Sequence, residues 1–163
     1  MRKSLIGIFG ALALIGWGFG AQAIAADAKA EITELEHKFA ASTTTDEAMS
    51  LVDPSDELVV YDLQTPREFD GPAAVRADFQ NYFENAKNPK AEFLSLHVIT
   101  DGKLGVAESI QHFTYTDKSG KTIDSILRQT DVWRKEKGDW KIIHSHISYP
   151  TDMASGKADM HSK

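Results

Sequence analysis

Residues 128–149, RQTDVWRKEKGDWKIIHSHISY, contain the clearest structural pattern in this chain. Apolar and polar residues alternate on both sides of Lys137-Gly138, which predicts two antiparallel strands joined by a tight turn. We set the register by placing Lys135 opposite Trp140, because residues directly opposite each other share a face of the sheet. One face then carries Gln129, Asp131, Trp133, Ile142, His144, His146 and Ser148, and the other carries Ile126, Arg128, Thr130, Val132, Ile143, Ile147 and Tyr149.

The first of these faces is polar at its centre, and helices are expected to cover it. Burying polar groups is costly unless they line a wet cavity or bond to one another. We therefore interpret this face as the wall of a pocket that contains Asp62, Gln129, Asp131, His144 and His146. A hydrogen-bonded core network without any ligand is the alternative.

Outward from the hairpin, the sequence predicts helices before strands. Helical spacing covers residues 27–41, a Thr44/Glu47 capping box opens a second helix, and Gly71-Pro72 opens a third. Strands are predicted at residues 58–62, 93–100, 104–116, 122–135 and 140–149. This order predicts an α+β fold with three helices on one face of a curved antiparallel sheet. Residues 151–163 are small, polar and aperiodic, so we expect a disordered tail.

The N-terminus has the features of a secretory signal peptide. Arg2 and Lys3 precede an apolar run, and an Ala-x-Ala pattern ends near Ala25. We expect cleavage there, a domain over residues 26–150, and a periplasmic or secreted protein that has no membrane anchor after cleavage. The chain has no cysteine and a net charge of −6, which argues against disulfides and nucleic-acid binding.

Several short motifs resemble a known superfamily. They are Thr130-Asp131-Val132-Trp133, Gly138-Asp139-Trp140, and His144 to Ser148, with Tyr82 to Asn85 and His97 to Ile99 upstream. In this order they resemble the association (hub) domain of calcium/calmodulin-dependent kinase II and the SnoaL-like proteins. The resemblance implies the nuclear transport factor 2-like fold, a cone of bent sheet with three helices and a deep pocket. Hub domains carry a pocket arginine where this chain has Asp131, which argues against an anionic ligand.

Asp62 resembles the catalytic base of the ketosteroid isomerases, which share this fold. In that family the base lies nine residues before the glycine that opens the third helix, as Asp62 lies before Gly71. The family also places an oxyanion-stabilising tyrosine on the first helix, but this chain has no tyrosine before Tyr61. The main stabiliser of an enolate is therefore missing.

The candidate catalytic residues are Asp62, Asp131 and His144, with Asp131 and His144 as an acid/base pair or a structural ion pair. Gln129, His146, Trp133 and Ser148 are candidate ligand-binding residues, although Trp133 also suits core packing. We predict no metal and no cofactor, because spacing fixes no further ligand beside the two imidazoles.

Three classes of function follow from these features. We favour an exported protein that binds an apolar or mixed small molecule. The alternatives are an isomerase or a lyase/hydrolase that uses Asp62 or the Asp131–His144 pair, and an oligomerisation module. We also predict a homodimer through the outer sheet face, on which Ile126, Val132, Ile143, Ile147 and Tyr149 form an apolar patch.

Overall fold

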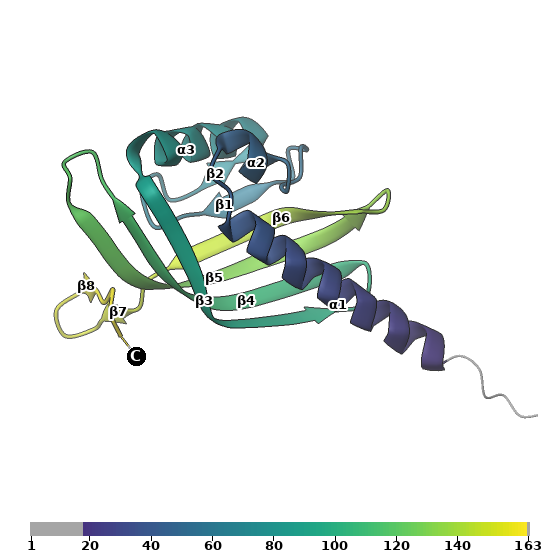
Figure 1. Ribbon diagram of the computed structural model, residues 1–163. Helices are drawn as coiled ribbons and strands as arrows, with labels where there is room; N and C mark the ends of the chain where they lie inside the picture. The colour runs from purple at the N-terminus through teal and green to yellow at the C-terminus, as the bar shows by residue number, and fades with distance from the viewer. Residues whose placement is uncertain (1–17, 163) are drawn as a thin grey trace, which may run out of the picture.

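A computed structural model of the chain describes residues 18–162 and contains three helices and a curved sheet (Figure 1). The helices are α1 (Gly18–Ala40), α2 (Thr45–Met49) and α3 (Gly71–Asn85). The strands are β1 (Val59–Tyr61), β2 (Phe69–Asp70), β3 (Lys87–Thr100), β4 (Leu104–Thr116), β5 (Thr122–Glu136), β6 (Asp139–Ser148), β7 (Thr151–Asp152) and β8 (Lys157–Ala158). Within residues 18–162, no helix has the length and apolar character needed to span a membrane.

The main sheet has the strand order β2-β1-β6-β5-β4-β3. All neighbouring strands are antiparallel except β1 and β6, which pair in parallel with Val59 beside His144. The long strands β3 to β6 bend around one side of the molecule, and the helices lie on the concave side (Figure 1). The α+β fold class predicted from the sequence is therefore confirmed.

The helix starts follow the signals in the sequence. The Thr44 hydroxyl accepts a hydrogen bond from Glu47 N at 3.2 Å, and the Glu47 carboxylate accepts from Thr44 N at 3.2 Å, which completes a capping box. Gly71 has a φ of 78°, a value that favours glycine, and Pro72 follows in the first turn of α3. These caps fix where the chain enters α2 and α3.

The core lies between α1, α3 and the concave face of the sheet. Its fully buried members are Ile32, Leu58, Val75, Trp133 and Ile142, each 0 % exposed. Gly105 on β4 lets α1 approach the sheet, because a β-carbon there would collide with the Ile32 side chain. The first helix is thereby held close to β3 and β4.

The predicted register of the last hairpin is correct near the turn and wrong beyond it. Lys135 pairs with Trp140 and Trp133 with Ile142, as expected. A β-bulge then shifts the pairing, so that Asp131 lies opposite Ser145 rather than His144. Because a bulge adds one residue to one strand, every later side chain of β6 moves to the other face.

The bulge changes the composition of both faces of the sheet. His144, His146 and Ser148 leave the concave face, and Ser145, Ile147 and Tyr149 replace them there. The outer apolar patch predicted for a homodimer therefore loses Ile147 and Tyr149. The homodimer itself stays a prediction.

The segment predicted to be a disordered tail is ordered through Ser162. Strands β7 and β8 form a small hairpin, and Ile126 N donates to Met160 O at 2.7 Å. Pairing of β6 with β5 stops at Arg128, which leaves the backbone of Ile126 without a partner from β6. The returning chain supplies that partner, which explains its order. Residues 1–17, which hold most of the predicted signal peptide, lie outside the described residues.

Candidate functional site

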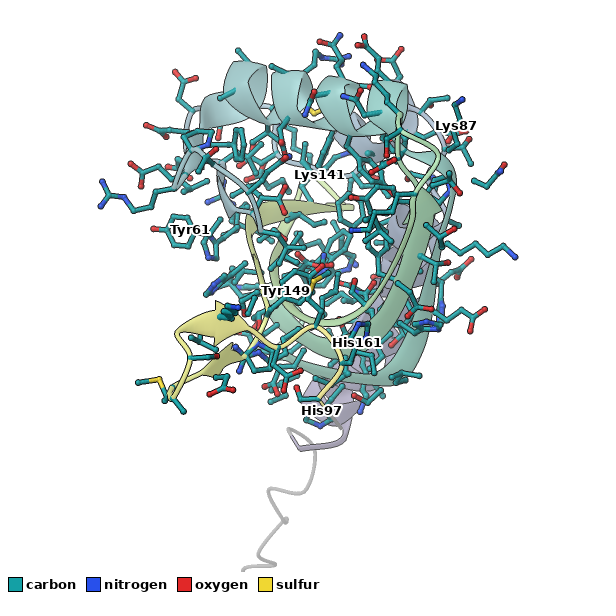
Figure 2. The ribbon with its side chains drawn as sticks, turned by 90° about the vertical axis from the view of Figure 1, so that its left-hand side faces the viewer. Tyr61, Lys87, His97, Lys141, Tyr149 and His161 are labelled. Carbon is teal, nitrogen blue, oxygen red and sulfur yellow. The ribbon has the colours of Figure 1, made fainter. Side chains whose placement is uncertain are left out.

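A cavity of about 450 Å³ lies between the concave face of the sheet and helices α1 and α3. Its wall is mainly apolar and includes Phe39, Phe79, Phe83, Phe113, Leu127 and Ile147. Tyr149 also lines it and lies within the curve of the sheet (Figure 2). A concave, mostly apolar space with a few polar groups is typical of a small-molecule site.

One group of polar side chains forms the inner polar cluster, defined by Glu36, Gln111, Gln129 and Ser145 on the cavity wall and Asp131 behind them. Gln111 Nε2 donates to Gln129 Oε1 at 3.0 Å, and Gln129 Nε2 donates to Asp131 Oδ2 at 2.7 Å. On the side of α1, Trp133 Nε1 donates to Glu36 Oε1 at 2.5 Å. The cluster links the cavity to the core through hydrogen bonds.

Glu36 and Asp131 share a proton within this cluster. Burial and the nearby charge of Asp131 raise the pKa of Glu36 from 4.5 to about 9. Burial also raises the pKa of Asp131, while hydrogen bonds to its charged form act in the opposite direction. Near pH 7 the proton therefore resides on Glu36, which donates it to Asp131, and the pair carries one negative charge.

A second group of polar side chains, the Asp62 cluster, consists of Asp62, Gln64 and Asp78 on the cavity wall. Gln64 Nε2 donates to Asp78 Oδ1 at 2.9 Å and to Asp62 Oδ2 at 3.4 Å. Burial, followed by the charge of Asp62, raises the pKa of Asp78 to about 7. A carboxyl group that titrates near neutral pH, as Asp78 does, can donate a proton to a bound molecule or accept one from it.

We expect the Asp78 carboxyl group to titrate near neutrality, and Asp62→Asn to lower its pKa toward the ordinary aspartate value. The reason is that the substitution removes the neighbouring negative charge that opposes ionisation of Asp78. The NMR chemical shift of the Asp78 carboxyl carbon, followed against pH, measures this pKa in the wild type and in Asp62→Asn. Asp56→Asn, an exposed substitution, is the control and leaves the titration unchanged. A midpoint that is the same with and without Asp62 would contradict the pairing.

Only some of the residues that the sequence predicted for the site lie at the cavity. Asp62 and Gln129 line the cavity, and Asp131 lies directly behind its wall. Trp133 is fully buried in the core and does not line the cavity, so its predicted contact with a ligand is wrong.

His144, His146 and Ser148 lie on the outer face, so the predicted Asp131–His144 pair does not form. His144 Nδ1 lies 2.9 Å from Val59 O, and its ring centroid lies 5.0 Å from that of Tyr61. His146 packs on the same tyrosine, which points away from the sheet toward solvent (Figure 2). Within residues 18–162, no three His, Cys, Asp or Glu side chains are grouped to hold a metal ion.

Sequence reasoning missed Glu36, Asp78 and Ser145. The spacing in the sequence could have identified the first two, because Glu36 follows Ile32 by four residues and Asp78 follows Val75 by three. That spacing puts each carboxylate on the apolar stripe of its helix, where an ionisable group is unusual. Ser145 was missed because nothing in the sequence marked the bulge.

Comparisons with known proteins agree with this architecture. The family model of the SnoaL-like domain matches residues 30–152. An NTF2-like protein of unknown function from Pseudomonas putida KT2440 superposes with a TM-score of 0.74 at 24% identity, covering 85% of this chain and 97% of that chain. An NTF2-like superfamily protein from Salmonella enterica superposes with a TM-score of 0.71 at 22% identity, covering 82% of this chain and 99% of that chain.

A Xanthomonas campestris protein named for the calcium/calmodulin-dependent protein kinase II association domain gives a TM-score of 0.58 at 24% identity, covering 85% of this chain and 91% of that chain. No curated protein matches the chain significantly in sequence. The structural likenesses establish the fold, and the chemistry of the site has to be derived from its own residues.

Proposed function

Because the chain belongs to the SnoaL-like domain family, we propose that it binds a small, largely apolar molecule in the cavity beneath α1 and α3. The cavity itself carries this proposal. Its volume of about 450 Å³ suits a drug-sized ligand, and its mainly apolar wall includes several aromatic side chains. The inner polar cluster and the Asp62 cluster would orient the ligand.

We expect Ala91→Trp to weaken binding of the neutral dye Nile red at least about tenfold, since an indole would occupy part of the cavity. Ala91 lines the cavity and is only half-buried, so the larger side chain need not disturb the core. Fluorescence titration measures the affinity. Ala73→Trp on the exposed side of α3 is the matched control. Equal affinities in the two variants would show that the dye binds elsewhere.

We propose that the protein acts outside the cytoplasm, after removal of the signal peptide. Among residues 24–40 of α1, the first buried side chain is Ala28, and Ile24 is 61% exposed. A cut near Ala25 would therefore leave the core contacts of α1 in place. This packing supports a domain that begins near residue 26.

The expected result for protein isolated from the producing cell is an intact mass that lacks about the first 25 residues. Mass spectrometry of the envelope fraction and of the medium measures the cut site and the compartment. Substituting Ala23 and Ala25 by bulky residues is expected to block processing, because the peptidase requires small residues. A mass that corresponds to all 163 residues would refute the proposal.

Acid–base catalysis is a second candidate function, and the Asp62 cluster favours it. A carboxyl group with a pKa of about 7 on a cavity wall suits proton transfer at neutral pH. Tyr82 and Tyr115 line the same cavity and offer phenol groups, whereas the first helix has no tyrosine. Turnover that is lost in Asp62→Asn, with Nile red binding retained, would distinguish an enzyme from a binding protein.

A further inference from the structure

The amide donors of the inner polar cluster are largely used within the protein. Gln111 Nε2 donates to Ser109 Oγ at 2.9 Å and to Gln129 Oε1 at 3.0 Å. Gln129 Nε2 must face Asp131, because a carboxylate only accepts hydrogen bonds. This orientation fixes both amides and leaves mainly oxygen atoms to meet a bound molecule.

Ser145 provides an independent sign of a ligand at this point. It lines the cavity and is only 4% exposed. Among residues 18–162 its Oγ makes no hydrogen bond of ordinary geometry, although it lies close enough to Asp131 to lower the pKa of that carboxyl group. Asp131, its neighbour across the strands, accepts hydrogen bonds from Gln129 and from the protonated Glu36. Buried polar atoms without partners are rare in folded proteins. If the Ser145 hydroxyl donates its proton toward Asp131, its oxygen can still accept a hydrogen bond. A ligand at this point would therefore have to be a hydrogen-bond donor.

The ionisable side chains around the cavity are mostly carboxyl groups, of which Glu36 is protonated near pH 7. Glu36, Asp62 and Asp78 line it from α1, the segment after β1, and α3, and Asp131 lies behind β5. Among the described residues, Lys90, an exposed residue of β3, is the one basic side chain in the wall. An anionic ligand would be repelled, whereas a cation would be attracted by the buried Asp131 carboxylate behind the wall and by several aromatic faces on it.

We propose that the ligand is an aromatic or aliphatic amine, whose protonated nitrogen donates hydrogen bonds to Ser145 and the neighbouring oxygens of the inner polar cluster. Its apolar body then lies along the aromatic wall toward Phe79 and Phe113. This inference rests on the proposed function, since it requires that the cavity binds a small molecule.

The test compares three probes of nearly equal shape: 2-(1-naphthyl)ethylamine, 2-(1-naphthyl)ethanol and 1-naphthylacetate. Each is titrated against the Nile red complex at pH 7. The amine is expected to bind at least about tenfold more tightly than the alcohol, because its hydrogen bonds are charge-assisted. The carboxylate is expected to bind most weakly. Equal binding of amine and alcohol, or tightest binding of the carboxylate, overturns the inference.

Substitutions test whether the preference for the amine over the alcohol arises at the inner polar cluster. Asp131→Asn removes the negative charge and keeps the shape, so the amine should lose its advantage over the alcohol. Asp124→Asn, an exposed change on the same strand, is the matched control and should keep that advantage. Ser145→Ala should weaken the amine severalfold, and it tests the site if Asp131→Asn does not fold. An amine affinity that Ser145→Ala leaves unchanged overturns the inference.

The two proposals fail in different ways. If Nile red binds and the amine does not displace it preferentially, the cavity binds small molecules and the amine inference is wrong. If neither the dye nor any of the three probes binds, the proposed function is wrong, and the amine inference falls with it.

Discussion

Trp133→Ala lowers the free energy of unfolding by about 3–5 kcal/mol, the usual cost of removing a large aromatic side chain from a closed core. Trp133 is 0% exposed and belongs to the cluster that includes Ile32, Val75 and Ile142. Its indole also donates to Glu36, so the substitution leaves a buried carboxyl group without that donor. Urea denaturation at pH 7, followed by circular dichroism, measures the loss.

Two milder substitutions separate packing from hydrogen bonding. Trp133→Phe keeps most of the ring and should cost about 1–3 kcal/mol through the lost hydrogen bond to Glu36. Trp140→Phe loses a bond to the exposed Glu31, and about 1 kcal/mol is expected there. If Trp133→Ala were as stable as Trp140→Phe, the indole of Trp133 would not be part of the core.

Glu36→Gln should remove much of the pH dependence of stability between pH 5 and pH 9. The folded-state pKa of Glu36 is raised from 4.5 to about 9, chiefly by burial, so the folded protein holds a proton that the unfolded chain releases. The stability that this proton provides is complete below pH 4.5 and is lost as the pH rises through that interval. One proton corresponds to a slope of about 1.4 kcal/mol per pH unit. Glutamine keeps the donor to Asp131 and the acceptor for Trp133 but cannot ionise.

Denaturation curves at several pH values give the comparison. The wild type should lose stability from pH 5 to pH 9, and Glu36→Gln should lose much less. Glu31→Gln on the same helix is the control, because hydrogen bonds to Lys135 and Trp140 lower the pKa of Glu31. Its contribution is complete above pH 4.5 and is lost on acidification, so it leaves the alkaline slope unchanged. Equal slopes in wild type and Glu36→Gln would contradict the assignment of the proton.

Most of the fold could be predicted because local signals agreed with one another. The capping box at Thr44, the glycine and proline that open α3, and the Asp101-Gly102 turn each fix an element boundary. The strand at residues 104–116 has the bounds that its alternation predicts. Hairpin turns set which strands are neighbours, so the order of β3 to β6 followed directly.

The site was predicted less well, because it depends on long-range geometry. Asp62 was found through a family resemblance, and Gln129 through the correct alternation of β5. The bulge in β6 then reversed the parity of every residue after it, and the two histidines were exchanged for Ser145 and Ile147. The alternation of residues along a strand predicts the face of each side chain only as long as the strand pairing is regular. No residue in the sequence marks the position of the bulge in β6.

The bulge also separates the length of β6 from the chemistry of the cavity. Trp133 pairs with Ile142 and Val132 with His144, so Ile143 has no partner on β5. Deleting Ile143 would restore regular pairing and keep Ser145 opposite Asp131, on the cavity side. Loss of this one residue thus shortens the strand in evolution without exchanging the side chains at the cavity floor.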